Sequence, residues 1–233
     1  MTELVKVEQH GGVGELVLNR PQQRNSLIGP LVWELTEGLQ ILMADTDCHV
    51  IVIRGAEGYF CAGLDLKAFS ADPVPEWKSE FQQDWMNFHR QVFACDKPII
   101  GALEGFAIAG GSALAFSCDF LVVGETSFLH VAEVERGMMA PINIFWLSVR
   151  YSYQLALKMA LLGERHYGAE LVRLGVADRC VADAEVVTVA RAMAARFCEF
   201  DTGNTQLLKR ATRCAAVSPD PEKAFDLILA TFS

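Results

Sequence analysis

The sequence lacks a long uninterrupted apolar run, although it is rich in apolar residues. Hydrophobic residues make up 52% of the 233 positions, yet no window holds the roughly 18 uncharged apolar residues of a membrane span. The first ten residues, MTELVKVEQH, alternate charged and apolar residues and do not form the apolar segment of a signal peptide. These absences predict a cytoplasmic protein with no membrane partner.

The sequence also lacks the patterns of metal sites and of nucleic-acid-binding proteins. Its seven cysteines are irregularly spaced without a CxxC pair, and its five histidines never form HxxxH, so we expect no metal site. Reduced, mostly buried thiols are the simpler interpretation. Acidic residues outnumber basic ones by 29 to 20, for a net charge of −9. This balance argues against nucleic acid as a partner, and an anionic ligand would need a local basic patch.

Strand, turn and helix patterns follow one another without a linker, which is typical of a single α/β domain. The run VIVIRG is typical of a strand buried on both faces. Strands are predicted at 3–10, 14–19, 50–55, 98–105, 119–124 and within 175–181, and helices at 31–45, 75–95, 110–117, 143–162, 168–174, 184–199 and 203–216. We predict one domain over 1–233, with a core of about 1–185 and a helical C-terminal part of about 186–233.

Two loops that follow predicted strands have glycine at the turn, CAGLD and IAGG. Ligands of α/β sheets bind at such strand ends, where a backbone N–H after a glycine or at a helix start carries positive partial charge without a partner. If the N–H groups of Leu64 and Gly110 converge, they form an oxyanion hole. The alternative is that Gly110 and Gly111 only permit close packing of helix and strand. Ser112 is a poor nucleophile candidate, because GGSAL is not GxSxG.

Five segments, taken in order, resemble the crotonase (enoyl-CoA hydratase/isomerase) superfamily. They are LNRPQQRNSL, VIVIRGAEGYFCAGLDL, KPIIGALEGFAIAGGSALAFSCDFLVV, HVAEVERGM and LLGERHYGAELVRLGVADRCV. The resemblance implies an α/β crotonase-like spiral of ββα repeats with a C-terminal helical region. It also implies a homotrimer or a dimer of trimers, an acyl-CoA thioester as ligand, and no cofactor beyond the coenzyme A of that substrate. A fold alone does not fix the reaction.

The resemblance also assigns site residues, with Leu64 and Gly110 at the family's oxyanion-hole positions. The positions that match the CoA and substrate path are Arg24, Ser26, Leu27, Ala62, Asp65, Leu66, Lys67, Ala113 and Gly137, with Lys209, Arg210 and Arg213 as further candidates for phosphate contacts. Arg24 and Lys67 could equally be solvated charges, and Asp65 a helix N-cap. The predicted pocket wall consists of Trp77, Phe81, Trp85, Met138 and Trp146.

Family hydratases use two glutamates, and this sequence matches only one of them. The first position holds Ala113 and the second holds Glu133. Hydration needs one group to deprotonate water and another to protonate carbon, whereas a single glutamate can shuttle one proton between two carbons. The resemblance therefore favours isomerase-like or single-glutamate hydratase/lyase chemistry, with Glu133 as general acid/base and its pKa raised by burial. The alternative for Glu133 is a surface carboxylate beside Glu135 and Arg136.

Ala113 leaves other functions open. The chain could be a catalytically weak acyl-CoA-binding homologue, a decarboxylase or thioester hydrolase of the family, or a subunit that only assembles with a related chain. Two polar residues near Glu133 also have two interpretations each. His130 either reaches the pocket or is a hydrogen-bonded structural residue, and Asn143 either orients water or a substrate group or caps the following helix.

Overall fold

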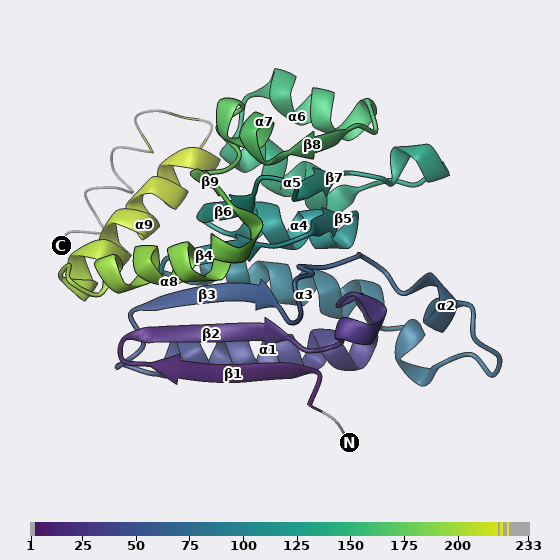
Figure 1. The fold of residues 1–233 in the computed structure, drawn as a ribbon, viewed down its shortest axis with the longest axis horizontal. Helices are drawn as coiled ribbons and strands as arrows, with labels where there is room; N and C mark the ends of the chain where they lie inside the picture. The colour runs from purple at the N-terminus through teal and green to yellow at the C-terminus, as the bar shows by residue number, and fades with distance from the viewer. Residues whose placement is uncertain (1–2, 219, 221–222, 224–233) are drawn as a thin grey trace.

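The large sheet of the fold has six strands in the order β1-β2-β3-β4-β6-β9 (Figure 1). The computed structural model describes residues 3–218, 220 and 223. Strands β1 (Val5–His10) and β2 (Val13–Leu18) form an antiparallel hairpin, and every later pair in this sheet is parallel. The other members are β3 (Val50–Gly55), β4 (Ile99–Leu103), β6 (Phe120–Gly124) and β9 (Arg179–Val181). The predicted α/β class is confirmed.

Strand β3 is buried on both faces, as its continuous apolar run predicts. Ile51 and Ile53 belong to the core that includes α1 (Gly29–Ala44) and α3 (Phe81–Ala94). Val50 and Val52 belong to a second cluster that includes residues of α8 (Val186–Phe197), the helix that crosses the front of the sheet in Figure 1. Successive side chains of a strand point to opposite faces, so the parallel sheet is covered on both sides.

A second, smaller sheet turns the chain into a spiral. Strands β5 (Phe106–Ile108) and β7 (Phe128–His130) pair in parallel, and β8 (Arg165–Tyr167) is antiparallel to β7. Isolated parallel bridges, Leu27 with Leu64 and Cys61 with Ala107, extend this pairing to the earlier turns. Each turn of the spiral therefore contributes one long strand to the large sheet. It also contributes one short segment, which pairs with the short segment of the neighbouring turn, and then a helix.

The remaining helices largely follow the predicted ranges. They are α2 (Leu66–Phe69), α4 (Gly110–Ser117), α5 (Pro141–Arg150), α6 (Tyr153–Leu161), α7 (Gly168–Arg173) and α9 (Thr202–Val217), with 3-10 turns at Pro21–Gln23, Glu76–Lys78, Val134–Arg136 and Asp183–Glu185. The single helix predicted over 143–162 is wrong, because α6 begins anew where the Ser152 hydroxyl accepts a hydrogen bond from the Leu155 N–H (3.3 Å). Much of the predicted C-terminal part beyond Ser218 lies outside the described residues.

Helix α9 is held to the body of the protein by ion pairs. Lys209 Nζ lies 2.6 Å from an Asp119 oxygen, and Arg213 lies 2.9 Å from Asp96, which also pairs with Arg210. These cations were predicted to contact nucleotide phosphates. The structure gives them another role, because each faces a carboxylate just before β4 or β6.

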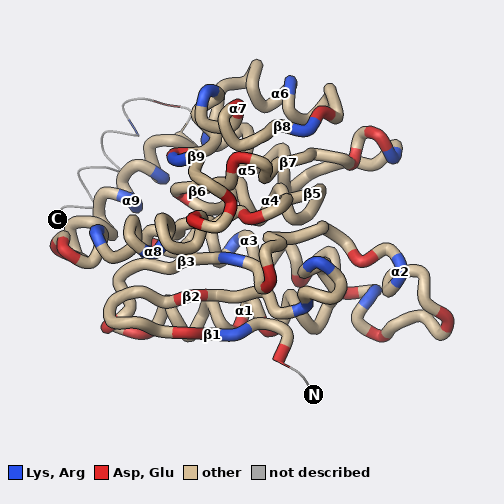
Figure 2. Tube along the Cα trace, in the orientation of Figure 1, with Lys and Arg blue, Asp and Glu red and all other residues tan. Residues whose placement is uncertain are grey.

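The surface and the thiols fit the composition. Charged residues lie mostly on the outer loops and helices, and few lie along β4, β5 and α4 (Figure 2). All seven cysteines are free thiols, and four of them are buried. No helix in the described part of the chain combines the length and the hydropathy needed to cross a bilayer.

Candidate active site

Three neighbouring segments of the spiral end at the same place. The segment at Cys61 is bridged to Ala107 of β5, and β5 pairs with β7. The chain continues from these segments to Leu64, Gly110 and Glu133, respectively. Ligands of α/β proteins bind at the carboxyl ends of parallel strands. The three predicted site residues therefore follow neighbouring segments, although the first and the last are 69 positions apart in the sequence.

The two glycine turns are in direct contact. Gly63 has a φ of +80°, a conformation that glycine adopts without strain. A Cβ at Gly63 would lie 2.5 Å from the Ile108 carbonyl oxygen and 3.4 Å from the Gly110 nitrogen. A Cβ at Gly111 would lie 2.2 Å from the Cys61 carbonyl oxygen. Gly111 is thus required for close packing, and a side chain at Gly63 would push the two turns apart.

The N–H groups of Leu64 and Gly110 have no hydrogen-bond partner within the described residues. The bonds of the adjacent bridge fall on either side of Leu64: the Leu27 N–H donates to Gly63 O (2.7 Å), and the Asp65 N–H donates to Leu27 O (3.0 Å). Gly110 is the first residue of α4, where an N–H has no intrahelical acceptor. Free donors on two contacting turns are suited to an oxygen that acquires negative charge.

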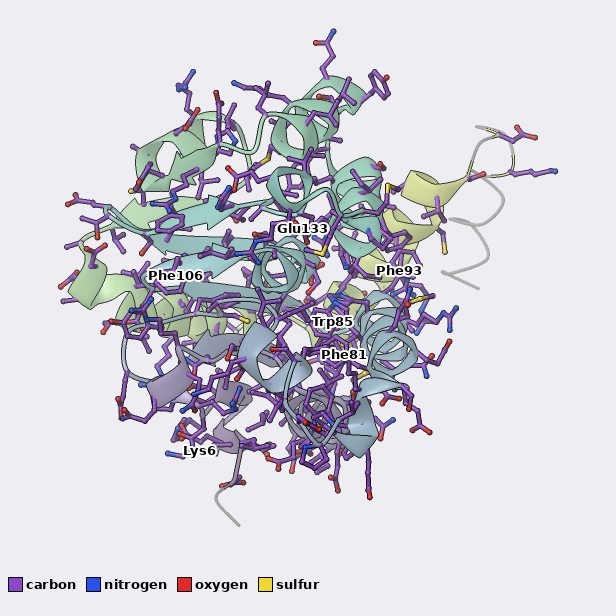
Figure 3. The ribbon with its side chains drawn as sticks, turned by 90° about the vertical axis from the view of Figure 1, so that its right-hand side faces the viewer. Lys6, Phe81, Trp85, Phe93, Phe106 and Glu133 are labelled. Carbon is purple, nitrogen blue, oxygen red and sulfur yellow. The ribbon has the colours of Figure 1, made fainter. Side chains whose placement is uncertain are left out.

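Glu133 lies toward the middle of the face shown in Figure 3. The Asn143 Nδ2 donates to its Oε1 at 2.9 Å, and its Oε2 is buried without a partner among the described residues. Burial raises the pKa of Glu133, and hydrogen bonds from its own N–H and from Asn143 offset this rise only in part. Glu135 and Arg136 are exposed, so Glu133 does not share their surface environment. A carboxyl group in this setting is suited to taking up and releasing a proton.

No carboxylate accompanies Glu133 from α4, whose sequence is GGSALAFS. Ala113 is 1% exposed and presents only a methyl group. The Ser112 hydroxyl is buried and hydrogen bonds to the carbonyl oxygens of Ala107 (2.9 Å) and His130 (2.8 Å), which supports its exclusion as a nucleophile. The His130 ring lies 3.0 Å from the Gly163 carbonyl oxygen and is therefore a hydrogen-bonded structural residue.

The residues predicted for the CoA path lie on two loops that hydrogen bond to each other. The Ala62 N–H donates to Arg24 O at 3.1 Å, and the bridge between Leu27 and Leu64 continues the pairing. Leu66 begins the short helix α2 and is exposed. The structure therefore brings the predicted residues of 24–27 and 62–67 together, and the second of these loops contains the glycine turn at Gly63.

Within these loops, Asp65 has a structural role. Its Oδ1 accepts a hydrogen bond from the Ala68 N–H (3.0 Å), which makes it the N-cap of α2, and its Oδ2 pairs with Arg20 (3.0 Å). Burial would raise the pKa of Asp65, but these partners outweigh it and lower the pKa. Arg20 also donates to Ser26 O (2.6 Å). The N-cap was one of the two roles predicted for Asp65, whereas Arg20 was not predicted as part of the site.

Two cations beside these loops have no ion-pair partner in the described part of the chain, namely Arg24 and Lys67. Both residues are exposed, and the Arg24 guanidinium lies 6.0 Å from the ring centres of Tyr59 and Phe106. Acidic and basic segments both lie around α2 in Figure 2. Arg24 and Lys67 are thus two exposed cations without an ion-pair partner in the described residues. Gly137 is exposed and ends the 3-10 turn after Glu133 with a φ of +65°.

The aromatic residues predicted for the pocket wall divide into two groups. Trp77 and Phe81 pack together beside α2, and Trp85 lies one turn further along α3 (Figure 3). Trp146 lies on α5, where it is 1% exposed and its Nε1 donates to His89 Nδ1 at 2.9 Å. Phe81 and Trp85 are buried in the same core. Burial lowers the pKa of His89 to about 3, so this histidine is neutral.

A cavity of about 750 Å³ lies between α9, α5 and the end of α3, and the two glycine turns do not line it. Trp146, Arg150 and Lys209 are among its lining residues, whereas Leu64, Gly110 and Glu133 are not. The volume of this cavity therefore says nothing about the ligand of the glycine turns. Met138, another residue of the predicted wall, is exposed and does not line it.

The fold and the site together define an α/β spiral with paired backbone donors and one half-buried carboxylate. The family model for enoyl-CoA hydratase/isomerase matches residues 8–228. A probable enoyl-CoA hydratase from Rhizobium meliloti (strain 1021) is 32% identical over 211 residues, which cover 90% of this chain and 80% of that relative. A carnitinyl-CoA dehydratase from Proteus mirabilis (strain HI4320) is 28% identical over 196 residues, which cover 83% of this chain and 74% of that relative.

The solved structures agree with this match. A probable enoyl-CoA hydratase/isomerase from Mycobacterium abscessus superposes with a TM-score of 0.86 at 32% identity, covering 100% of this chain and 89% of that one. The enoyl-CoA hydratase from Bacillus anthracis has the same fold, with a TM-score of 0.91 at 22% identity over 98% of this chain and 89% of that chain. The chain belongs to the enoyl-CoA hydratase/isomerase family of enzymes, and its fold is the crotonase-like spiral.

Proposed function

We propose that this protein is an acyl-CoA enzyme that moves one proton on a thioester enolate. The N–H groups of Leu64 and Gly110 hold the thioester oxygen, and Glu133 is the sole general acid/base. The observation that carries the proposal is the pairing of one half-buried carboxylate, on Glu133, with a methyl group at Ala113, where family hydratases have a second glutamate. The reaction is isomerase-like or that of a single-glutamate hydratase/lyase.

The proton balance of the isomerase-like reaction needs no co-reactant. Glu133 removes a proton from C2 of a 3-enoyl thioester, and the electron pair moves onto the thioester oxygen to give a dienolate. The same carboxyl group returns the proton to C4, so that the double bond moves from C3–C4 to C2–C3. The raised pKa of Glu133 favours this step, because a carboxyl group that is easily protonated can both accept and return the proton.

The enolate oxygen carries the charge that forms between these two proton transfers. The donors proposed for it, Leu64 N–H and Gly110 N–H, are free within the described residues and lie on contacting turns. Loss of one such donor typically costs about 3 kcal/mol in the transition state. The pair therefore supplies the stabilisation that a single weak base does not.

The two exposed cations Arg24 and Lys67 support coenzyme A as the carrier of the acyl group. Arg24 and Lys67 are exposed and unpaired in the described structure, as a contact to CoA phosphates requires. We propose no cofactor beyond the CoA of the substrate. A homotrimer or dimer of trimers remains a prediction from the family resemblance, and a cytoplasmic location remains a prediction from the sequence.

The test is hydrogen exchange in deuterated water, followed by NMR on a small panel of acyl-CoA and 3-enoyl-CoA thioesters. Wild type should exchange α- and γ-protons, and Glu133→Gln should lose about 10³-fold in rate, within the range of general acid–base catalysis. Glu135→Gln, two residues away and exposed, is the matched control and should exchange like wild type. Exchange that survives in Glu133→Gln would refute the role of Glu133.

Ala113 supports a second candidate, an acyl-CoA-binding homologue with little catalysis. Its wild type would bind the thioesters in a calorimetric titration but exchange no protons. Ala113→Glu would then restore hydration of crotonyl-CoA, because it returns the second carboxylate to α4. Binding without exchange, together with hydration by Ala113→Glu, would replace the first proposal with this one. Absence of binding would instead favour a subunit with a purely structural role.

A further inference from the structure

Asn143 makes hydrogen bonds to both halves of the candidate site. It is the third residue of α5 and is 1% exposed. Its Nδ2 donates to Glu133 Oε1 at 2.9 Å and to the Ala109 carbonyl oxygen at 3.1 Å. A carbonyl oxygen only accepts hydrogen bonds, so the amide nitrogen must be the atom that faces it. The same nitrogen therefore joins the carboxylate to the backbone before α4.

The Ala109 carbonyl belongs to the same peptide group as the Gly110 N–H. This group is planar, with its oxygen and its N–H on opposite sides, so a bond that fixes the Ala109 oxygen also fixes the direction of the Gly110 N–H. Ala109 has a φ of +52°, which is uncommon for a residue other than glycine. Its N–H donates to His130 O (2.9 Å), and its oxygen also accepts from the Ala113 N–H (3.1 Å). Such a conformation persists where surrounding bonds impose it.

The amide oxygen of Asn143 argues against a role in folding stability alone. Its Oδ1 is buried without a partner in the described residues, as is Glu133 Oε2. An unpaired buried polar atom of this kind is unfavourable for folding. Asn143 also does not cap α5, whose N-cap is Ala140, so the helix-cap alternative is wrong. Its two donated bonds, both to the candidate site, are what the side chain contributes.

We propose that Asn143 is a positioning residue that aims the Gly110 N–H at the thioester oxygen and holds the Glu133 carboxylate beside it. This inference rests on the proposed function, because it names what orients the two groups that the function uses. One amide would then set the geometry of the oxyanion donor and of the base together.

The experiment compares Asn143→Asp and Asn143→Ala with wild type, and uses Ser148→Ala, at an exposed position of the same helix, as the control. Asn143→Asp keeps the shape of the side chain but, when ionised, has no N–H to donate. Both Asn143 variants should lose at least about tenfold in the rate of proton exchange, a smaller loss than direct removal of an oxyanion donor causes. The affinity for acyl-CoA should change less than about threefold, because Asn143 orients groups that act in the transition state.

The pH profile separates positioning from packing. The Asn143 amide favours the charged form of Glu133, so its removal should move the acid limb of the exchange rate to higher pH, and Asn143→Asp should move it further through like-charge repulsion. Ser148→Ala should leave the limb unchanged. Variants that fold and bind acyl-CoA yet keep the wild-type rate and pH profile would overturn the inference.

Two measurements without substrate keep this inference distinct from the proposed function. Ala–Gly occurs only twice in the sequence, at 62–63 and 109–110, so with ¹³C-carbonyl alanine and ¹⁵N-glycine a carbonyl-to-amide correlation spectrum shows only the amides of Gly63 and Gly110. Asn143→Ala should shift the Gly110 amide much more than the Gly63 amide. The ¹³C signal of the Glu133 carboxyl, identified by its loss in Glu133→Gln, should titrate at higher pH in both variants. If wild type exchanges no protons, the proposed function fails, but unmoved Gly110 and Glu133 signals would overturn the role of Asn143 in either case.

Discussion

Two glutamates of this protein lie in contrasting surroundings. Glu15, on β2, is fully buried, and both of its carboxylate oxygens accept hydrogen bonds from arginines, with Arg54 Nε and Arg191 Nη2 each 2.8 Å from Oε2. Glu133 is half-buried and has one amide donor and one oxygen without a partner in the described structure. Burial would raise the pKa of Glu15, but its arginines outweigh burial and lower it, whereas burial raises the pKa of Glu133.

The difference shows how one residue type can serve stability in one place and chemistry in another. Two guanidinium partners keep Glu15 ionised and joined to a neighbouring strand and to α8. Glu133 has no such cation within hydrogen-bonding distance among the described residues, so burial keeps its pKa raised and the carboxyl group is suited to taking up and releasing a proton. The complement of hydrogen-bond partners therefore distinguishes a structural carboxylate from a catalytic candidate more clearly than burial does.

The largest expected effect on stability is that of Glu15→Gln. The change leaves Arg54 partly buried without its main partner, which costs about 3 kcal/mol of the free energy of unfolding, at the low end for buried pairs because Arg191 is half-exposed. Chemical denaturation at pH 7 measures this loss, with the exposed Glu37→Gln as control. Proton exchange per folded molecule should stay at the wild-type rate. If a folded Glu15→Gln protein lost much of its proton-exchange rate, Glu15 would not be a purely structural carboxylate.

The surroundings of Glu133 were easier to predict from the sequence than those of Glu15. Leu64, Gly110 and Glu133 could be named as candidates because they lie in short motifs that resemble those of a family. The pairs of Glu15 were not found, because its partners lie 39 and 176 residues away and no local pattern marks them. Asn143 was named without its contacts for the same reason, since they depend on how α5 packs beside α4.

The fold shows the same division. Long apolar strands such as β3 carry a clear pattern, and their bounds were predicted closely. The strands β5, β7 and β8 have three residues each, too few for an alternation to be recognised. These short strands and the bridge at Cys61 bring the site segments together. The part of the fold that assembles the site was therefore the part that local sequence patterns could not show.

A second prediction is that the two glutamates give opposite slopes of stability against pH. The pKa of Glu15 is lower in the folded state than the reference value of 4.5, so its contribution is present above about pH 4.5 and is lost as pH falls through the folded pKa. The pKa of Glu133 is raised, so the folded protein is favoured below pH 4.5 and loses that contribution as pH rises.

Denaturation curves from pH 3 to pH 8 check these signs. The deficit of Glu15→Gln should shrink toward pH 3, whereas Glu133→Gln should equal wild type near pH 4 and be as stable or up to about 1 kcal/mol more stable at pH 8, as is common where a functional group is removed. A Glu133→Gln protein that is clearly less stable at pH 8 would show that Glu133 is a structural carboxylate like Glu15.

The smallest expected effect is on acyl-CoA binding and concerns three cations near the site, of which one is paired and two are not. Arg20 is bound to Asp65, whereas Arg24 and Lys67 are exposed without an ion-pair partner in the described residues. Arg24→Ala and Lys67→Ala should each weaken acyl-CoA binding by about threefold, as expected for an exposed charge pair, and the loss should diminish as salt is added. Calorimetric titration at two salt concentrations measures this, with Lys158→Ala on α6 as a remote control. Equal affinities for all four proteins would show that the CoA phosphates are bound elsewhere.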